Sequence, residues 1–172
     1  MKEFLEKLAP YHFFNYLLPG TLFVILAEKF ANYNLYQSDI FLGLLLYYFI
    51  GLAISRFGSL VFEPVLKKAG FIVFSEYEDF LDALKKDTKI EMLSEVNNMY
   101  RTLFTLFVLL ILLKLYTIFE PTLKLTTGWS QFILIVALLV MFLFAYRKQS
   151  EYITNRVKVN KKKSPKIKRD AN

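Results

Sequence analysis

The chain has 172 residues and a net charge of +7, and 55% of its residues are hydrophobic. A soluble domain of this size has too small a core to bury so much apolar surface, and the apolar residues gather in long uncharged runs. The absence of cysteine excludes disulfides, thiolate metal sites and cysteine nucleophiles. We therefore predict an all-α, polytopic membrane protein with four transmembrane helices and a short helical cytoplasmic insertion between spans 2 and 3.

Residues 1–10 predict a short amphipathic helix, because charged side chains alternate with apolar ones until Pro10 stops the pattern. We expect this helix to lie flat on the cytoplasmic interface of the membrane. A secretory signal peptide is the alternative interpretation. Glu3 and Glu6 argue against it, since they interrupt the basic leader, and no small-residue cleavage site follows.

Residues 11–59 contain the first two predicted spans. Span 1 begins near Phe13, and Pro19 and Gly20 interrupt it early. Proline removes a backbone hydrogen bond, so the sequence predicts a kink or a helix restart at this point. In lipid the freed carbonyl needs a partner, which indicates that this face of the helix meets protein.

Span 2 is predicted over Ile40–Ser55, sixteen residues without a charge, with a helical rise of about 24 Å. Gly51, Ser55 and Ser59 follow one another at intervals of four residues. Small residues on one face let two helices approach closely, so this spacing predicts a packed face.

Residues 60–100 form the predicted cytoplasmic helical segment. Residues 75–96 have a helical periodicity, in which Tyr77, Phe80 and Leu81 share one face, and acidic residues precede basic ones. That order of charges complements a helix dipole. We expect a solvated helix here.

Residues 101–147 contain spans 3 and 4, predicted over Thr102–Phe119 and Gly128–Tyr146, with a short outer loop from Glu120 to Thr127. Lys114 is the one charge within these spans, and Glu28 and Glu120 are its candidate partners. Residues 148–172 form a basic cytoplasmic tail.

The distribution of basic residues predicts the topology. Nineteen of the 22 lysines and arginines lie in the amino end, the central segment or the tail, whereas Lys29 and Lys124 lie on the other side. Basic residues favour the cytoplasmic side of a membrane. We therefore place both termini in the cytoplasm.

No catalytic, metal-binding or cofactor-binding motif occurs in the chain, so we expect neither an enzyme nor a cofactor. His12, the sole histidine, lies at the start of span 1, where we expect a structural role. Polar and charged residues do recur near the predicted inner membrane surface. Ionisable groups at a span end need water or a partner, which predicts an ion-pair layer that is either a polar vestibule or ordinary interfacial anchoring. Its members are Asn15, Arg56 with Glu63, Glu95, Asn97, Asn98 and Arg101.

The basic tail is expected to contact anionic lipid headgroups or to be solvated. Nucleic acid is the less favoured partner, because no aromatic residues follow Tyr152 to stack on bases.

The layout resembles that of small bacterial four-span membrane proteins that accompany phage-defence operons, including accessory membrane proteins of CRISPR systems. The stretches that carry the resemblance are Asn15–Gly20, Ile50–Ser59 and Asn97–Arg101. The resemblance implies a non-enzymatic, oligomeric membrane effector or membrane partner of a cytosolic protein in a bacterial inner membrane, with residues 63–98 facing that protein. The expected output is either altered membrane integrity or a scaffold at the membrane. A constitutive small channel or transporter subunit is the alternative function.

Overall fold

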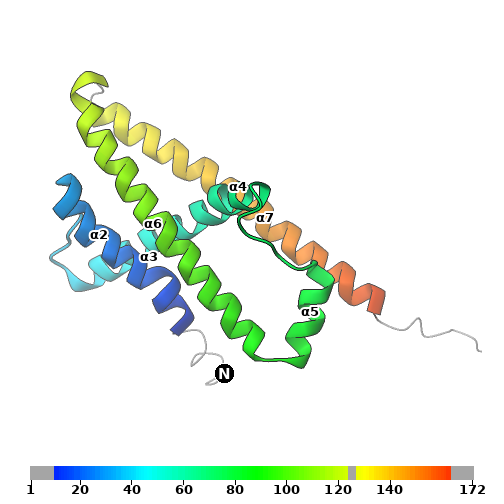
Figure 1. The fold of residues 1–172 in the computed structure, drawn as a ribbon. Helices are drawn as coiled ribbons and strands as arrows, with labels where there is room; N and C mark the ends of the chain where they lie inside the picture. Colours follow the sequence, from blue (N-terminus) through cyan, green and yellow to red (C-terminus); the bar gives the residue numbers. More distant parts are fainter. Residues whose placement is uncertain (1–9, 124–126, 164–172) are drawn as a thin grey trace, which may run out of the picture.

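The structure is a computed structural model that describes residues 10–123 and 127–163. Within these ranges every regular element is a helix (Figure 1), which confirms the all-α class. The elements are η1 (Phe13–Leu17), α2 (Leu18–Ala31), α3 (Ile40–Phe57), η2 (Gly58–Phe62), α4 (Glu63–Lys68), α5 (Tyr77–Lys86), α6 (Lys89–Leu123) and α7 (Thr127–Lys163).

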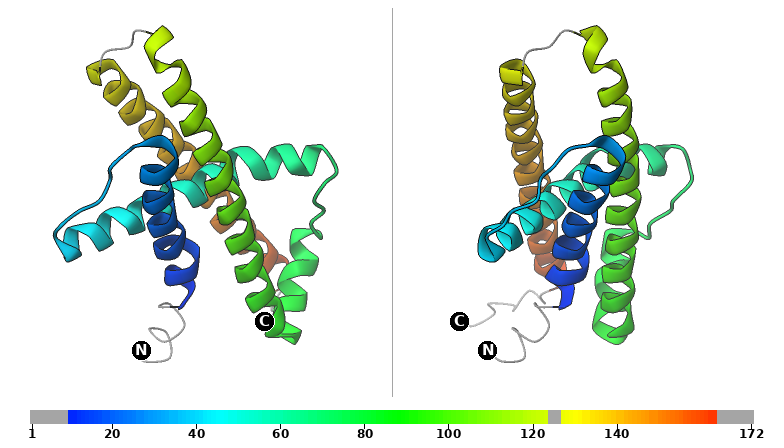
Figure 2. Two further views of the ribbon diagram at one scale, coloured as in Figure 1. Left: turned by 60° about the vertical axis from the view of Figure 1, so that its left-hand side comes forward. Right: turned by 90° about the vertical axis from the view of Figure 1, so that its left-hand side faces the viewer.

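Four helical stretches are long and apolar enough to cross a membrane, as the sequence predicts. They are Pro10–Ala31, Ile40–Lys68, Lys89–Glu120 and Gly128–Lys161. Figure 2 shows that the stretches starting at Pro10 and Lys89 begin at the same end of the bundle, where α7 also ends. We call this the terminal end. Helix α6 ends and α7 begins at the opposite end.

The helices extend beyond the predicted spans. The periodic stretch 75–96 is not one helix, because Asp87 is extended and its carboxylate accepts the Lys89 backbone N–H at 2.9 Å, which starts α6. Helix α6 then continues past Glu120 to Leu123, where an outer loop was expected, and α7 continues past Tyr146 to Lys163. The predicted amphipathic helix before Pro10 and the end of the basic tail lie outside the described residues.

Each of the two π turns, η1 and η2, precedes a proline. In both turns the residue before the proline, Leu18 or Glu63, donates its backbone N–H to the carbonyl five residues earlier. A proline ring clashes with the carbonyl four residues before it, and a wider turn moves that carbonyl aside. Pro19 therefore does not end the first helix. It is accommodated within a continuous helical stretch, Pro10–Ala31.

The first two helical stretches touch backbone to backbone. A Cβ added at Gly20 would lie 1.7 Å from the Tyr47 carbonyl oxygen, and one added at Gly51 would lie 1.8 Å from the Tyr16 carbonyl oxygen. The contact is reciprocal, since each glycine follows by four residues the tyrosine that the other glycine meets. Glycine is required at both positions because no side chain fits.

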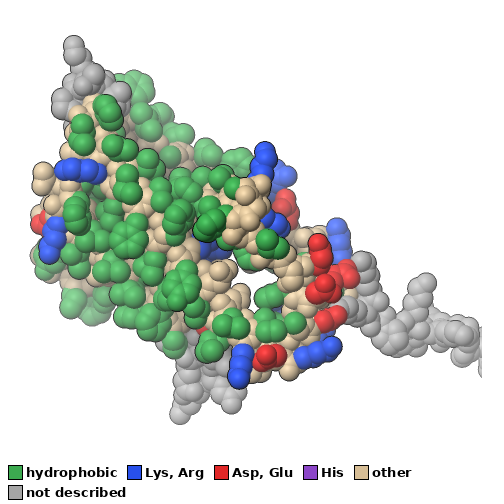
Figure 3. All heavy atoms as spheres, viewed as in Figure 1, with side chains coloured by type: hydrophobic (Ala, Val, Ile, Leu, Met, Phe, Trp, Pro, Cys, Tyr) green, Lys and Arg blue, Asp and Glu red, His purple; other side chains and the backbone are tan. Residues whose placement is uncertain are grey.

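A small apolar core extends this contact to α6. Ala27 of α2, Ile54 of α3, and Leu106 and Leu110 of α6 are buried against one another. By contrast, no residue in the most apolar window of α7 is buried. Helix α7 contacts α3 and η2, with the Phe49 and Phe142 rings stacked at 5.8 Å. In Figure 3, hydrophobic side chains cover much of the visible face, and charged ones gather mainly around α4 and α5.

The glycine contact gives a first prediction. Gly51→Ala should lower the stability of the purified protein in detergent by about 1–3 kcal/mol, because the added methyl group overpacks a backbone contact. Gly20→Ala should act similarly. Thermal unfolding followed by circular dichroism measures the change. Gly128→Ala is the matched control, since its Cβ would meet nothing within 4 Å. Equal midpoints for all three variants would contradict the prediction.

Candidate functional site

One carboxylate holds three helical elements together at the level where the apolar stretches of α6 and α7 give way to charge. Glu63, the first residue of α4, accepts hydrogen bonds on both oxygens: Oε2 from Arg101 Nη1 of α6, and Oε1 from Lys148 Nζ of α7 at 3.0 Å. The side chains of Glu63, Arg101 and Lys148 are only 15%, 21% and 24% exposed. We call these three residues the Glu63 triad.

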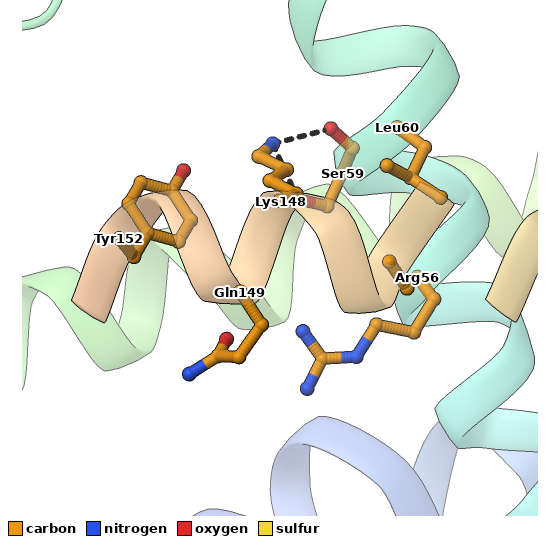
Figure 4. A pocket seen from close by; sticks show the side chains of 7 residues that line it. Arg56, Ser59, Leu60, Lys148, Gln149 and Tyr152 are labelled. Atoms are coloured by element: carbon orange, nitrogen blue, oxygen red, sulfur yellow. Dashed lines mark hydrogen bonds between the residues drawn. The ribbon is translucent and has the colours of Figure 1, made fainter. Parts of the chain in front are cut away.

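The ammonium group of Lys148 has a full set of acceptors. Besides Glu63, it donates to the Ser59 carbonyl oxygen at 2.7 Å and to Ser59 Oγ at 2.8 Å, as Figure 4 shows in part. Three acceptors match the three N–H donors of a lysine. A charge-assisted arrangement of this kind fixes the side chain much more firmly than a single surface ion pair.

The Ser59 carbonyl is free to accept because of Pro64. In a regular α-helix it would receive the N–H of Glu63, but that N–H bonds to the Gly58 carbonyl in the π turn. The next candidate donor is Pro64, which has no N–H. The π turn thus leaves one carbonyl without a partner inside its own helix, and Lys148 supplies that partner from α7.

The small-residue face of span 2 touches a different element at each step. Gly51 lies against the Tyr16 carbonyl of the first helix, Ser55 Oγ accepts from Thr102 Oγ1 of α6 at 3.2 Å, and Ser59 binds Lys148 of α7. All three small residues are buried. One helix face therefore carries the contacts to the three other candidate spans.

Arg56 does not belong to the triad, although the sequence groups it with Glu63. Among the described residues it forms no ion pair. Its guanidinium group extends towards Gln149 and away from Lys148 (Figure 4). Together with Ser59, Lys148 and Tyr152 it lines a cavity of about 20 Å³, which is room for one water molecule.

The other predicted members of the polar layer gather near the start of the first helix and α6. Asn15 is 2% exposed, and its Nδ2 donates to the Tyr11 carbonyl at 3.1 Å while its Oδ1 has no hydrogen-bond partner among the described residues. Asn15 and Glu95 line a separate cavity of about 260 Å³. The Asn98 carbonyl accepts from Thr102, whereas Asn97 is exposed.

His12 lies between tyrosines in the same region. Its Nδ1 is 2.8 Å from the Tyr48 hydroxyl oxygen, and its ring lies 5.4 Å from that of Tyr16. The histidine thus joins the first helix to α3 by a hydrogen bond and ring packing. At the other end of the bundle, Lys114 forms no ion pair with Glu28 or Glu120 within the part of the chain that the structure describes.

Sequence reasoning missed Lys148, because it was counted with the basic tail. The available signal was its place directly after the apolar stretch of span 4, at the same level as Arg101 before span 3. Glu63 was the only acidic residue available at the end of span 2. A single carboxylate near several cations favours an arrangement in which two cations share it, and Arg101 and Lys148 share Glu63 in this way.

The triad is suited to holding helices together, because its carboxylate pairs with one cation from each of two helices. No group of three or more histidine or acidic side chains suited to a metal ion occurs among residues 10–123 and 127–163. Arg101 Nε is buried and has no hydrogen-bond partner within the described part of the chain. The three side chains together carry one net positive charge, since two cations share one carboxylate.

Comparisons with protein-family models, curated proteins and solved structures return no match for this chain. Fold and site geometry are therefore the observations on which a function can be argued.

The triad gives a second prediction. Glu63→Gln should destabilise the protein by about 2–3 kcal/mol, because it leaves two largely buried cations without their carboxylate. Glu151→Gln is the matched control. It removes the partner of Arg147 in an exposed ion pair with side chains 60% and 74% exposed, which contributes below about 0.5 kcal/mol. Chemical or thermal unfolding in detergent separates the two; equal losses would contradict the shared-carboxylate account.

Proposed function

We propose that the chain is a non-enzymatic, oligomeric integral membrane protein of a bacterial inner membrane that couples a cytoplasmic protein partner to its membrane spans. Residues 63–98 receive the partner, and the Glu63 triad transmits the resulting movement to α6 and α7. The output is altered membrane integrity, by a triggered effector.

The observation that carries the proposal is the position of Glu63. It is the residue at which the helix of span 2 passes into the segment that leads to α5. Its two oxygens hold α6 and α7 at the same time. A displacement of α4 therefore moves the carboxylate relative to Arg101 and Lys148. If α6 and α7 move in different directions, one carboxylate cannot keep its hydrogen bonds to both.

The weak packing of α7 supports the same proposal. Its most apolar window has no buried residue, so little dispersion energy opposes its movement once Lys148 is released. An oligomer is proposed because the four predicted spans contain one charged residue, Lys114, so that one copy provides no polar path across the membrane. The role in phage defence remains a prediction that depends on the sequence resemblance alone.

The proposed topology predicts where reporters function. Alkaline phosphatase fused after either terminus should be inactive and green fluorescent protein should fluoresce, because both ends lie in the cytoplasm under the positive-inside bias. A phosphatase inserted at residue 125, between α6 and α7, should be active. Opposite behaviour of the two terminal fusions would contradict the even number of spans.

Membrane potential tests the coupling. Expression of the chain together with the proteins of its neighbouring genes should depolarise cells, whereas expression of the chain alone should not. A voltage-sensitive dye measures the membrane potential. Arg101→Gln or Lys148→Gln should change the response several-fold, because either releases one helix from Glu63; Arg147→Gln is the exposed control.

The other outcomes identify the alternatives. Depolarisation by the chain alone would show the constitutive channel instead of the triggered effector. No depolarisation under either condition would overturn altered membrane integrity as the output. If the response changes only in variants that are expressed at a lower level, the substitutions affect stability and not coupling. Immunoblots of the membrane fraction therefore accompany each measurement.

A further inference from the structure

Two apolar side chains in a short connection outside the candidate spans are more exposed, as a fraction of their surface, than any large hydrophobic side chain of the spans. Between α4 and α5, Phe71 and Val73 are 80% and 88% exposed, and Phe74 is 43% exposed. Ile72, between the first two, is partly covered. A water-facing connection rarely carries consecutive large apolar side chains without an interaction to cover them. We call residues 71–74 the apolar loop.

The apolar loop begins close to the Glu63 triad. It follows α4, which begins at Glu63 of the triad and ends only five residues later. Gly70 has a positive φ of 72°, and Phe71 N–H bonds to the Leu66 carbonyl, which closes α4 sharply. Figure 2 shows α4 and the connection that follows it projecting sideways from the bundle, level with the middle of α6.

Basic side chains accompany the apolar ones. Lys67 and Lys68 occupy the last turn of α4 and are exposed. Lys67 Nζ lies 5.8 Å from the centre of the Phe74 ring. Aromatic rings next to lysines are typical of the boundary between acyl chains and anionic headgroups, where the ring enters the apolar side and the ammonium stays among phosphates.

The apolar surface is also continuous with that of span 2. Val61 and Val65 lie four residues apart in η2 and α4 and are 40% and 59% exposed. The first exposed acidic residue after span 2 is Glu76, which follows the loop, because Glu63 is largely buried in the Glu63 triad. The exposed apolar surface thus ends where the negative charge starts, which is the order expected for a chain that dips into a leaflet and returns.

We propose that the apolar loop inserts into the cytoplasmic leaflet, with acyl chains around Phe71 and Val73 and anionic headgroups at Lys67 and Lys68. The proposal rests on the membrane topology proposed above. It makes the start of the 63–98 segment a membrane-attached element, so that a partner must act on α5 and the first turns of α6.

Site-directed spin labelling tests the insertion, since the chain has no cysteine of its own. Phe71→Cys and Val73→Cys are labelled with a nitroxide in vesicles of phosphatidylcholine with a minor fraction of phosphatidylglycerol. Collisions with oxygen report lipid, and collisions with a water-soluble nickel chelate report water. Leu139→Cys, on the exposed apolar face of α7, is the lipid reference, and Asp79→Cys in α5 is the water reference.

Both loop labels should show an oxygen-to-nickel accessibility ratio several-fold above that of Asp79→Cys and close to that of Leu139→Cys. Ratios like that of Asp79→Cys would overturn the proposal, and so would loss of access to both reagents, which would show protein covering the loop. A nickel-accessible Leu139→Cys would instead refute the membrane topology itself, so the two failures are distinguishable.

A second readout keeps the apolar side chain in place. The Trp129→Phe background removes the only native tryptophan. In this background, the tryptophan introduced by Phe71→Trp should emit in vesicles at a shorter wavelength than a water-exposed tryptophan, and lipids brominated near the headgroup should quench it. Lys67→Gln with Lys68→Gln should reduce the quenching in vesicles that contain phosphatidylglycerol and leave it unchanged in pure phosphatidylcholine. Unquenched emission would overturn the insertion, and equal quenching in both lipids would overturn the part assigned to the lysines.

Discussion

The fold depends on one carboxylate that has to satisfy two cations from different helices. Arg101 and Lys148 reach Glu63 from α6 and α7, and neither cation has another carboxylate among the described residues. A charge that is mostly removed from water needs a partner far more than an exposed one does. The three elements must therefore meet at one level, and this requirement sets how α6 and α7 align against the end of span 2.

The same place shows how a local backbone defect becomes a tertiary contact. Pro64 forces the π turn η2, the π turn leaves the Ser59 carbonyl without its own donor, and Lys148 donates to it. A π turn also precedes Pro19 in the first helix, next to the close contact between Gly20 and the Tyr47 carbonyl. Both prolines thus lie beside interhelical contacts, consistent with the need to pair every backbone group away from water.

The long uncharged runs of the sequence were sufficient to predict the four long apolar helices. A run such as Ile40–Ser55 is long and apolar enough for a membrane span. It was insufficient for the helix ends: α6 begins at Lys89 because Asp87 caps it, a side-chain detail that hydropathy does not contain. The pairing of charges also escaped prediction. The predicted layer offers Glu63 two cations, Arg56 and Arg101, and only the geometry of α7 decides that Lys148 from outside that layer pairs with Glu63 and that Arg56 does not.

Two kinds of contact divide the bundle. The first helix and α3 are held by a glycine contact and a shared apolar core. Because this contact is closely packed, any separation of the two helices reduces its stabilising energy. Helix α7 is held by the ring stack at Phe142, the Tyr116–Ser130 hydrogen bond at 3.0 Å and the bonds of Lys148. Loss of the charge interaction would leave the apolar stretch of α7 with these two small contacts at separate heights, while Val159 near the end of the helix stays buried. The candidate span that the Glu63 triad holds through Lys148 is therefore also the span least restrained by packing, which supports the proposal that a movement of α4 is passed on to α7.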